Sequence, residues 1–186
     1  MKKVVIISGH PDLKNSCANK TILDEISKLC PAVEIRKLDE LYPDYNFDVK
    51  TEQAALEKAD IIVFQYPMHW YSTPGILKLY IDKIFLHGWA YGSKGTALKG
   101  KTFIISVTEG APENEYTAEG AMKHTVEEFS YSLAGFAALC NLDCKKLFSI
   151  GGVMYVPGIT SDEQKNKLIE KCKKQAAEIV EYLKAL

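Results

Sequence analysis

The segment SGHPDLKNSCANK, residues 8–20, carries side chains that suit an anion, because His10, Ser16 and Asn19 can each donate a hydrogen bond. A helix that starts near Ser16 would add unpaired backbone N–H groups and the positive end of its dipole, which together favour a phosphate. The alternative is that Ser16 only caps the helix and His10 lies in a solvated turn. The sequence has no G-x-G-x-x-G and no G-x-x-x-x-G-K-[ST] pattern, so a standard dinucleotide or Walker-type site is not expected.

The segment QYPMHWYSTP, residues 65–74, places a cluster of aromatic side chains between two prolines. Pro67 and Pro74 restrict the backbone on both sides, so the aromatic side chains are held in place. Rigid aromatic residues form a suitable wall for a flat ring system. The alternative is that Trp70 and Tyr71 pack over the edge of a sheet or fill a contact between two chains.

The segment VTEGAPENEY, residues 107–116, offers polar groups to the edge of such a ring. Gly110 allows a close approach of the backbone, whose N–H groups can bind the carbonyl and nitrogen edge of a heterocycle. Tyr116 adds a phenol, although it is equally compatible with an ordinary surface tyrosine. The three segments together describe a phosphate pocket, an aromatic wall and a polar edge, a combination that suits flavin mononucleotide (FMN).

The hydrophobic pattern predicts the elements that must position these segments. Continuous apolar runs predict strands at residues 3–8, 60–65 and 101–108, and shorter patterns predict strands at 33–38 and 143–150. Helical spacing predicts helices over residues 16–29, 51–58, 74–85, 117–139 (with a break near Gly135) and 161–186, the last with Ser161 and Gln164 at its start.

Strands that alternate with helices indicate an α/β fold, a five-stranded parallel sheet with helices on both faces in the flavodoxin-like order. Ligands of such sheets bind beyond the carboxyl ends of the strands, where the strand order reverses. The loops expected to meet there are residues 9–15, 67–73 and 109–116.

The composition indicates one globular domain over residues 1–186, with 47% hydrophobic and 25% charged residues. A net charge of −1 gives no reason to expect nucleic acid as a partner. The apolar run at the start is too short for a signal peptide and no segment is long enough to span a membrane, so a cytoplasmic location is expected.

The five cysteines do not indicate a metal site, because no CxxC pattern occurs and no histidine lies near Cys140 and Cys144. Reduced and mostly buried thiols are expected. Cys17 is the exception, because a thiolate near a helix N-terminus would be stabilised.

Several motifs resemble the NAD(P)H:quinone oxidoreductase family of flavodoxin-like flavoproteins. These are HP followed by S-C-A-N, then P-M-H-W-Y-S-T-P, and then K-L-Y-I-D-K-I-F-L-H-G-W-A-Y-G. The segment LYPDYNFDV is also similar to the ancillary oxidoreductase subunits of bacterial glutathione-gated potassium efflux systems. The resemblance covers nearly the whole chain.

The resemblance implies an enzyme that takes hydride from NADH or NADPH and passes two electrons, by a ping-pong mechanism, to a quinone or similar acceptor. It implies FMN rather than FAD, because the family's FAD-binding members carry an additional C-terminal segment. Tyr116 matches a catalytic tyrosine that steadies the reduced flavin. The flavin-binding positions that it implies are His10, Ser16, Cys17, Ala18, Asn19, Pro67, Met68, His69, Trp70, Val107, Thr108, Glu109 and Gly110.

Two positions depart from the family pattern. Many members have T-T-G-G where this chain has T-E-G-A, and Glu109 would oppose an anionic reduced flavin, so its side chain is expected to point away from the ring. Some members have a histidine where this chain has Met122, and His124 is not expected to replace it.

The resemblance also implies a homodimer in which Trp70, Tyr71, Trp89 and Tyr91 form a substrate slot shared by two chains. One alternative is a regulatory flavoprotein that binds a membrane potassium efflux transporter and thus lies at the inner face of the membrane. Another is an electron carrier of the flavodoxin type, which the net charge of −1 disfavours because such carriers are strongly acidic.

Overall fold

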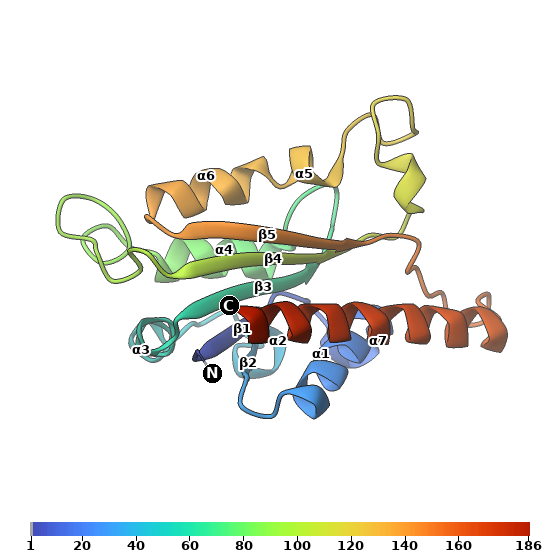
Figure 1. Cartoon of the computed structure of the whole chain (residues 1–186), viewed down its shortest axis with the longest axis horizontal. Helices are drawn as coiled ribbons and strands as arrows, with labels where there is room; N and C mark the ends of the chain where they lie inside the picture. The colour runs from blue at the N-terminus through green and yellow to red at the C-terminus, as the bar shows by residue number, and fades with distance from the viewer. Residues whose placement is uncertain (1) are drawn as a thin grey trace.

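Five parallel strands form one sheet in the order β2-β1-β3-β4-β5, as Figure 1 shows for a computed structural model that describes residues 2–186. The predicted flavodoxin-like fold is therefore confirmed. Because β2 and β3 lie on opposite sides of β1, the strand order reverses between β1 and β3. The strands are β1 (Val4–Ser8), β2 (Glu34–Lys37), β3 (Ile61–Pro67), β4 (Thr102–Thr108) and β5 (Asp143–Ile150).

The central strands are apolar on both faces because helices cover both. Ile6 pairs with Val63 and Val63 with Ile104, and these three side chains point to one face, while each following residue points to the other. The edge strand β5 differs: Asp143 and Lys145 are exposed there and form an ion pair of 2.6 Å.

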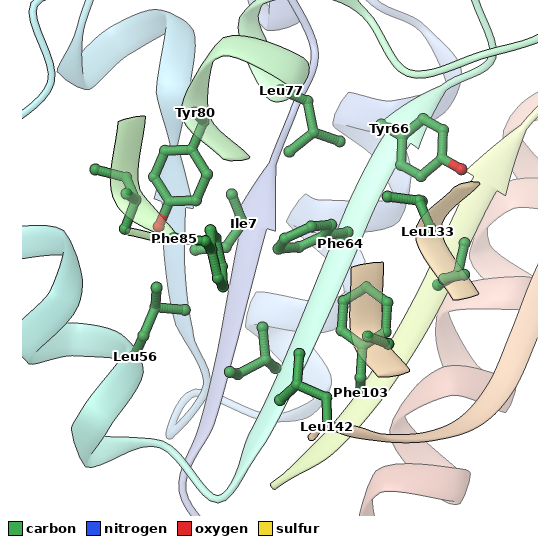
Figure 2. Close-up of a cluster of buried hydrophobic side chains, with 14 of the residues drawn as sticks. Ile7, Leu56, Phe64, Tyr66, Leu77, Tyr80, Phe85, Phe103, Leu133 and Leu142 are labelled. Carbon is green, nitrogen blue, oxygen red and sulfur yellow. The ribbon is translucent and has the colours of Figure 1, made fainter. Parts of the chain in front are cut away.

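Helices α1 (Ala18–Leu29) and α7 (Asp162–Ala185) pack on one face of the sheet. The other face carries α2 (Leu38–Leu41), α3 (Val49–Lys58), α4 (Gly75–Ile84), α5 (Val126–Phe129) and α6 (Tyr131–Leu139). Figure 2 shows Phe64 in this second core between Ile7 and Phe103, with a distance of 4.9 Å between the ring centroids of Phe64 and Phe103. Two short 3₁₀ helices, η1 (Leu13–Asn15) and η2 (Glu113–Glu115), lie in the loops.

The prediction of a mainly helical segment over residues 117–139 was wrong in its first part, since helix begins only at Val126. Residues 117–124 bond locally instead: the backbone N–H of Gly120 donates to the Thr117 hydroxyl, and that of Ala121 donates to the Glu115 carboxylate. The capping box of Thr125 and Glu128 then starts α5. The interruption lies at Ser130 rather than at Gly135. By contrast, the predicted capping box of Ser161 and Gln164 is present at the start of α7.

A buried ionic cluster connects β2, α3 and α4. Glu52 of α3 is fully buried and accepts hydrogen bonds from the Arg36 guanidinium, from the Tyr42 hydroxyl (2.5 Å) and from the Tyr80 hydroxyl (3.0 Å). Burial, followed by the contact with Glu52, raises the pKa of Tyr42 to about 12, so its hydroxyl remains a donor. The buried carboxylate thus has all the donors it needs, and this cluster fixes the second core beneath α4.

Candidate functional site

Four loops meet at the carboxyl-terminal edge of the sheet and enclose a cleft of ≈ 360 Å³. They follow β1, β3, β4 and β5, and the first two flank the point where the strand order reverses. The predicted site residues that line the cleft are His10, Ser16, Cys17, Ala18, Asn19, Pro67, Met68, His69, Thr108, Glu109 and Gly110. The cleft is also lined by Asp12 and Asn15, which lie in the expected loop 9–15, and by three residues that were not predicted, namely Val153, Met154 and Tyr155.

The loop after β1 presents a neutral imidazole to the cleft. The backbone N–H of Asp12 donates to His10 Nδ1 (3.0 Å), so the neutral ring carries its proton on Nε2. Burial lowers the pKa of His10, and the nearby His69 lowers it further. The ring centroids of these two histidines lie 6.4 Å apart. His10 is therefore a hydrogen-bond donor that needs no positive charge.

The start of α1 is fixed by Ser16, whose hydroxyl accepts a hydrogen bond from the backbone N–H of Asn19 (3.2 Å). Ser16 thus caps the helix and also borders the cleft, so the two roles considered for it occur together. The prediction of a stabilised thiolate at Cys17 was wrong, because burial raises the pKa of this half-buried thiol and Lys165 only partly opposes that effect.

Asn19 joins the first loop to two strands. Its side-chain amide donates to the hydroxyl of Thr108 (2.9 Å), and its carbonyl accepts a hydrogen bond from the side chain of Gln65 (2.8 Å). All three residues are buried. The polar end of Asn19 is therefore used within the scaffold, where it holds the start of α1 against the ends of β3 and β4.

The loop after β3 is a tight hairpin with two aromatic residues at its tip. His69 and Ser72 exchange backbone hydrogen bonds of 3.0 and 3.1 Å, and the residues between them, Trp70 and Tyr71, have φ angles of 48° and 62°. Left-handed backbone at two bulky residues is unfavourable and needs support from the surroundings. Tyr71 has such support, since its ring stacks on Phe129 at a centroid distance of 4.9 Å, whereas Trp70 is 93% exposed.

A second cavity of ≈ 230 Å³ adjoins the cleft and shares Met68, Gly110 and Met154 with it. The structure places Trp70 and Tyr116 on this second cavity rather than on the main cleft. Burial raises the pKa of Tyr116, and the nearby Glu109 raises it further, so its hydroxyl is a neutral donor at physiological pH.

Glu109, in the loop after β4, is only 1% exposed, and the expectation that its side chain points away into solvent was wrong. The reason is strand alternation: Glu109 lies two residues after Val107, whose side chain belongs to the second core, and helices cover that face. Both carboxyl oxygens of Glu109 are inaccessible and have no close hydrogen-bond partner among residues 2–186, and the backbone N–H of Ile150 is the main donor that favours the charged form. Burial is the main cause that raises the pKa of Glu109 to about 8.

A model of the protein family described as having a flavodoxin-like fold matches residues 2–179. The chain belongs to this flavodoxin-like family. It is 31% identical to general stress protein 14 of Treponema denticola, whose crystal structure is a complex with FMN. That match covers 97% of this chain and 99% of the other, with a TM-score of 0.86.

Another relative is the glutathione-regulated potassium-efflux system ancillary protein KefF of Enterobacter sp. (strain 638), 54% identical over 113 residues. The match spans 61% of this chain and 64% of the relative, slightly less than two thirds of its length. An NADPH-quinone reductase from P. pentosaceus shares the fold at 24% identity and a TM-score of 0.75, over 95% of this chain and 98% of that one.

The loop after β5 forms the fourth side of the cleft in this flavodoxin-like chain. The sequence did not lead us to expect this loop at the site. Lys171 of α7 holds this loop through the Gly151 carbonyl (2.7 Å) and the Glu113 carboxylate (2.8 Å). The backbone N–H of Val153 donates to the backbone carbonyl of Glu109 (3.2 Å), so the loop after β5 is joined to the loop after β4. The signal was present in the sequence, since the segment GGVMYVPG also follows a predicted strand and combines glycines with a tyrosine.

Some residues singled out in the sequence lie outside the cleft. Val107 is fully buried in the sheet. Trp89 donates to the Glu57 carboxylate of α3 (2.6 Å), in the connection that precedes β4 at the opposite end of the sheet (Figure 1). Tyr91 packs there against His87, with ring centroids 5.5 Å apart. His124 is exposed and pairs with Glu128, whereas Met122 lines the second cavity.

No group of three or more potential ligand side chains that could hold a metal ion occurs among residues 2–186. In the same part of the chain, no helix is both long and apolar enough to cross a membrane.

Proposed function

We propose that the chain is a single-domain, FMN-dependent NAD(P)H oxidoreductase that passes two electrons to a quinone or a similar acceptor. The observation that carries the proposal is the cleft at the switch point of the sheet, which gathers most of the flavin-binding positions that the sequence implied. The FMN complex of the 31% identical relative supports the choice of cofactor.

The residues of the cleft fit FMN in their chemistry. The first turn of α1 has the unpaired N–H groups of a helix start, and His10 adds a neutral donor, so this wall suits a phosphate. Pro67, Met68 and His69 would lie against the ring, and Thr108, Glu109 and Gly110 would meet its polar edge. The carboxyl oxygens of Glu109 are inaccessible, so the backbone of this residue, rather than its carboxyl group, would meet the ligand.

FMN, when bound, supplies the chemistry, since it accepts hydride from a nicotinamide and returns two electrons to an acceptor. The residues of this chain position it and exclude water. The second cavity, which borders the cleft at Met68 and Met154, would receive nicotinamide and acceptor in turn. Tyr116, with its neutral hydroxyl, would hold a hydrogen bond to the reacting ring from that cavity.

We further propose that the protein is a cytoplasmic homodimer. Trp70 is almost completely exposed at the mouth of the second cavity, and Met154 beside it is 63% exposed. Exposed apolar side chains at one site favour a covered surface. Trp89 and Tyr91 lie at the other end of the same sheet, so they would reach a substrate only if a partner chain brings its copies to the cleft.

The KefF relative favours a second role, that of a regulatory subunit for a membrane potassium efflux transporter. The two roles are compatible. A binding assay with the cytosolic domain of such a transporter would test the second one, and no binding at micromolar protein would count against it. A flavodoxin-type carrier is less favoured at a net charge of −1, and accumulation of a one-electron reduced flavin during a reductive titration would revive it.

The test of the main proposal is an absorption spectrum of the protein reconstituted with FMN, recorded anaerobically before and after NADH, then NADPH, then a quinone. Loss of the visible flavin bands with a nicotinamide and their return with quinone would support it, and the faster nucleotide would be the preferred one. A protein that does not take up FMN would refute the cofactor. A protein that binds FMN but is not bleached would refute the enzyme and leave the regulatory role.

A further inference from the structure

The segment VPGI, residues 156–159, forms an apolar turn in the loop that leads from β5 to α7 (Figure 1). The backbone N–H of Ile159 donates to the Val156 carbonyl (3.1 Å), with Pro157 and Gly158 between them and a φ of 79° at Gly158. Proline followed by a left-handed glycine is typical of a type II turn. This fixed turn holds Ile159 80% exposed, where an apolar side chain contributes nothing unless something covers it.

A third cavity, of ≈ 500 Å³, is lined by this turn and by the first turns of α7. Its apolar lining side chains are Met154, Val156, Ile159 and Leu168. Leu168 is buried, whereas Met154 and Ile159 are exposed. We call this cavity the apolar groove.

The polar side chains that line the apolar groove already have partners within the chain. The partner is a backbone N–H group for Thr160 (2.8 Å) and Gln164 (2.9 Å), and a carboxylate for Lys167 (2.6 Å) and Lys171 (2.8 Å). An occupant of the groove would therefore be held mainly by the apolar side chains.

Met154 connects the apolar groove with the candidate site, because it lines the groove, the cleft and the second cavity. The end of its side chain lies over Gly110, since a Cβ atom built on that glycine would come within 2.9 Å of Met154 Cε. Methionine is unbranched and adapts its shape to a ligand. A molecule bound in the second cavity can therefore continue past Met154 into the apolar groove.

We propose that the apolar groove holds the hydrocarbon side chain of a quinone whose ring reacts in the second cavity. The inference rests on the proposed function and narrows its acceptor to lipid-type quinones, which carry such a chain on the ring. The chain has no group that needs a hydrogen bond, and this matches a groove whose polar side chains are already bonded. It would cover Ile159 and thereby remove apolar surface from water.

A second copy of this chain fits the apolar groove less well. A stable interface covers about 800 Å² on each partner. At the start of α7, however, the groove is bordered by exposed charged residues, namely Asp162, Glu163 and Lys167. A narrow apolar occupant is therefore favoured over a protein surface.

The test compares two acceptors with the same ring, menadione and menadione with a geranyl side chain. Both are given to the FMN-loaded protein with the preferred nicotinamide nucleotide in excess. We expect kcat/KM to be about tenfold higher, or more, for the geranyl compound, a factor that corresponds to about 1.4 kcal/mol. Burial of about 60 Å² of apolar surface supplies that much.

Ile159→Asp should lower the ratio of the two kcat/KM values by about fivefold or more, because it places a charge against the hydrocarbon chain. Leu139→Asp is the matched control, since Leu139 is also exposed and lies before β5, at the other end of the sheet. Its ratio should equal that of the wild-type protein. A wild-type ratio in Ile159→Asp would overturn the inference. So would a dimer that this variant alone converts to monomers, because the groove would then be covered by a second copy.

Methyl NMR tests the groove without turnover. In the oxidised, FMN-loaded protein without nicotinamide, the geranyl compound should shift the methyl signals of Met154, Val156 and Ile159, whereas menadione should shift only that of Met154. Turnover of menadione with no shift at Val156 or Ile159 would overturn the inference alone. Absence of turnover with both quinones would overturn the proposed function, and the assignment of the groove to a substrate with it.

Discussion

The side-chain amide of Asn19, near the start of α1, donates a 2.9 Å hydrogen bond to the Thr108 hydroxyl at the end of β4. The two residues are 89 positions apart in the sequence, and this bond joins the start of α1 to the end of β4 at the cleft. Gln65, which binds the carbonyl of Asn19, adds the end of β3. The shape of the cleft therefore depends on one buried amide that connects three segments.

Asn19→Ala should lower both stability and flavin affinity, because it leaves the polar groups of Gln65 and Thr108 buried without partners. The loss in the free energy of unfolding should be about 1–3 kcal/mol, measured by urea denaturation. Lys20→Ala is the control, since Lys20 makes only an exposed ion pair with Asp24. Equal stability of the two variants would show that the buried amide does not hold the cleft together.

Glu52→Ala should destabilise the protein strongly without changing the cleft. Removing the carboxylate leaves two tyrosine hydroxyls without their partner in the second core and leaves Arg36 with only the exposed Glu34, a change that costs about 3–5 kcal/mol. FMN affinity per folded molecule should be unchanged, because Glu52 does not line the cleft. Glu40→Ala removes an exposed partner of Lys37 and serves as the control. A loss below about 1 kcal/mol in Glu52→Ala would contradict the role of this cluster.

The stability of the flavin-free protein should depend on pH through Glu109. Its pKa is raised from 4.5 to about 8 in the folded state, so the unfolded chain releases the proton at lower pH. The contribution of protonated Glu109 to the free energy of unfolding is fully present below about pH 4.5 and is lost as the pH rises towards about 8. The difference in unfolding free energy between the wild-type protein and Glu109→Gln should fall across this window, by at most about 1.4 kcal/mol per pH unit.

The comparison for this titration is Glu119→Gln, whose difference curve should be flat because that side chain is exposed. A flat curve for Glu109→Gln as well would mean that Glu109 is ionised in the folded protein. The measurement is thermal or urea unfolding at a series of pH values, with both variants treated alike.

Trp70→Gly should leave the protein as stable as before or raise its stability by about 1 kcal/mol, because glycine accepts the left-handed backbone that Trp70 adopts. The exposed indole makes few contacts that the variant would lose. Turnover with a quinone should fall, since Trp70 borders the second cavity. In Tyr131→Gly, at the exposed first residue of α6, stability should instead fall, by at most about 0.5–1 kcal/mol. A clear loss of stability in Trp70→Gly would argue against strain in the hairpin.

Tyr116→Phe should retain FMN and lose turnover by about tenfold or more, because it removes a donor without removing the ring. Tyr116 lines the second cavity and not the main cleft, which separates its effect on chemistry from any effect on cofactor binding. Steady-state kinetics and a binding titration of the same preparation would measure both. Unchanged kinetics would remove Tyr116 from the mechanism.

The parts that the sequence predicted best are those with local causes. The runs of β1, β3 and β4 are apolar because both faces of the sheet are covered, and the capping box of Ser161 and Gln164 lies within four consecutive residues. The loop positions followed from the strands. The parallel order follows from the alternation of strands and helices.

The parts that the sequence did not predict depend on contacts between distant segments. In the sequence, Glu52 is one charged residue of a helix among several. Its role appears only in the fold, where β2 and α4 place Arg36 and Tyr80 against it. Glu109 was expected to point outward because a carboxylate at the ring would oppose an anionic reduced flavin, yet its place two residues after Val107 directs it under the helices. In residues 117–124, side chains that bind the backbone locally replace the helix that the spacing favours.

The exposed edge of β5 limits how two copies of this chain can associate. Lys145 and Lys146 are both exposed on that strand, and Lys145 pairs with Asp143 within the same strand. Adding a strand from a neighbouring molecule would bring these ammonium groups close to their copies and would desolvate them. Lysines on an edge strand are a common protection against sheet extension. Two copies of this protein should therefore not join their sheets through β5.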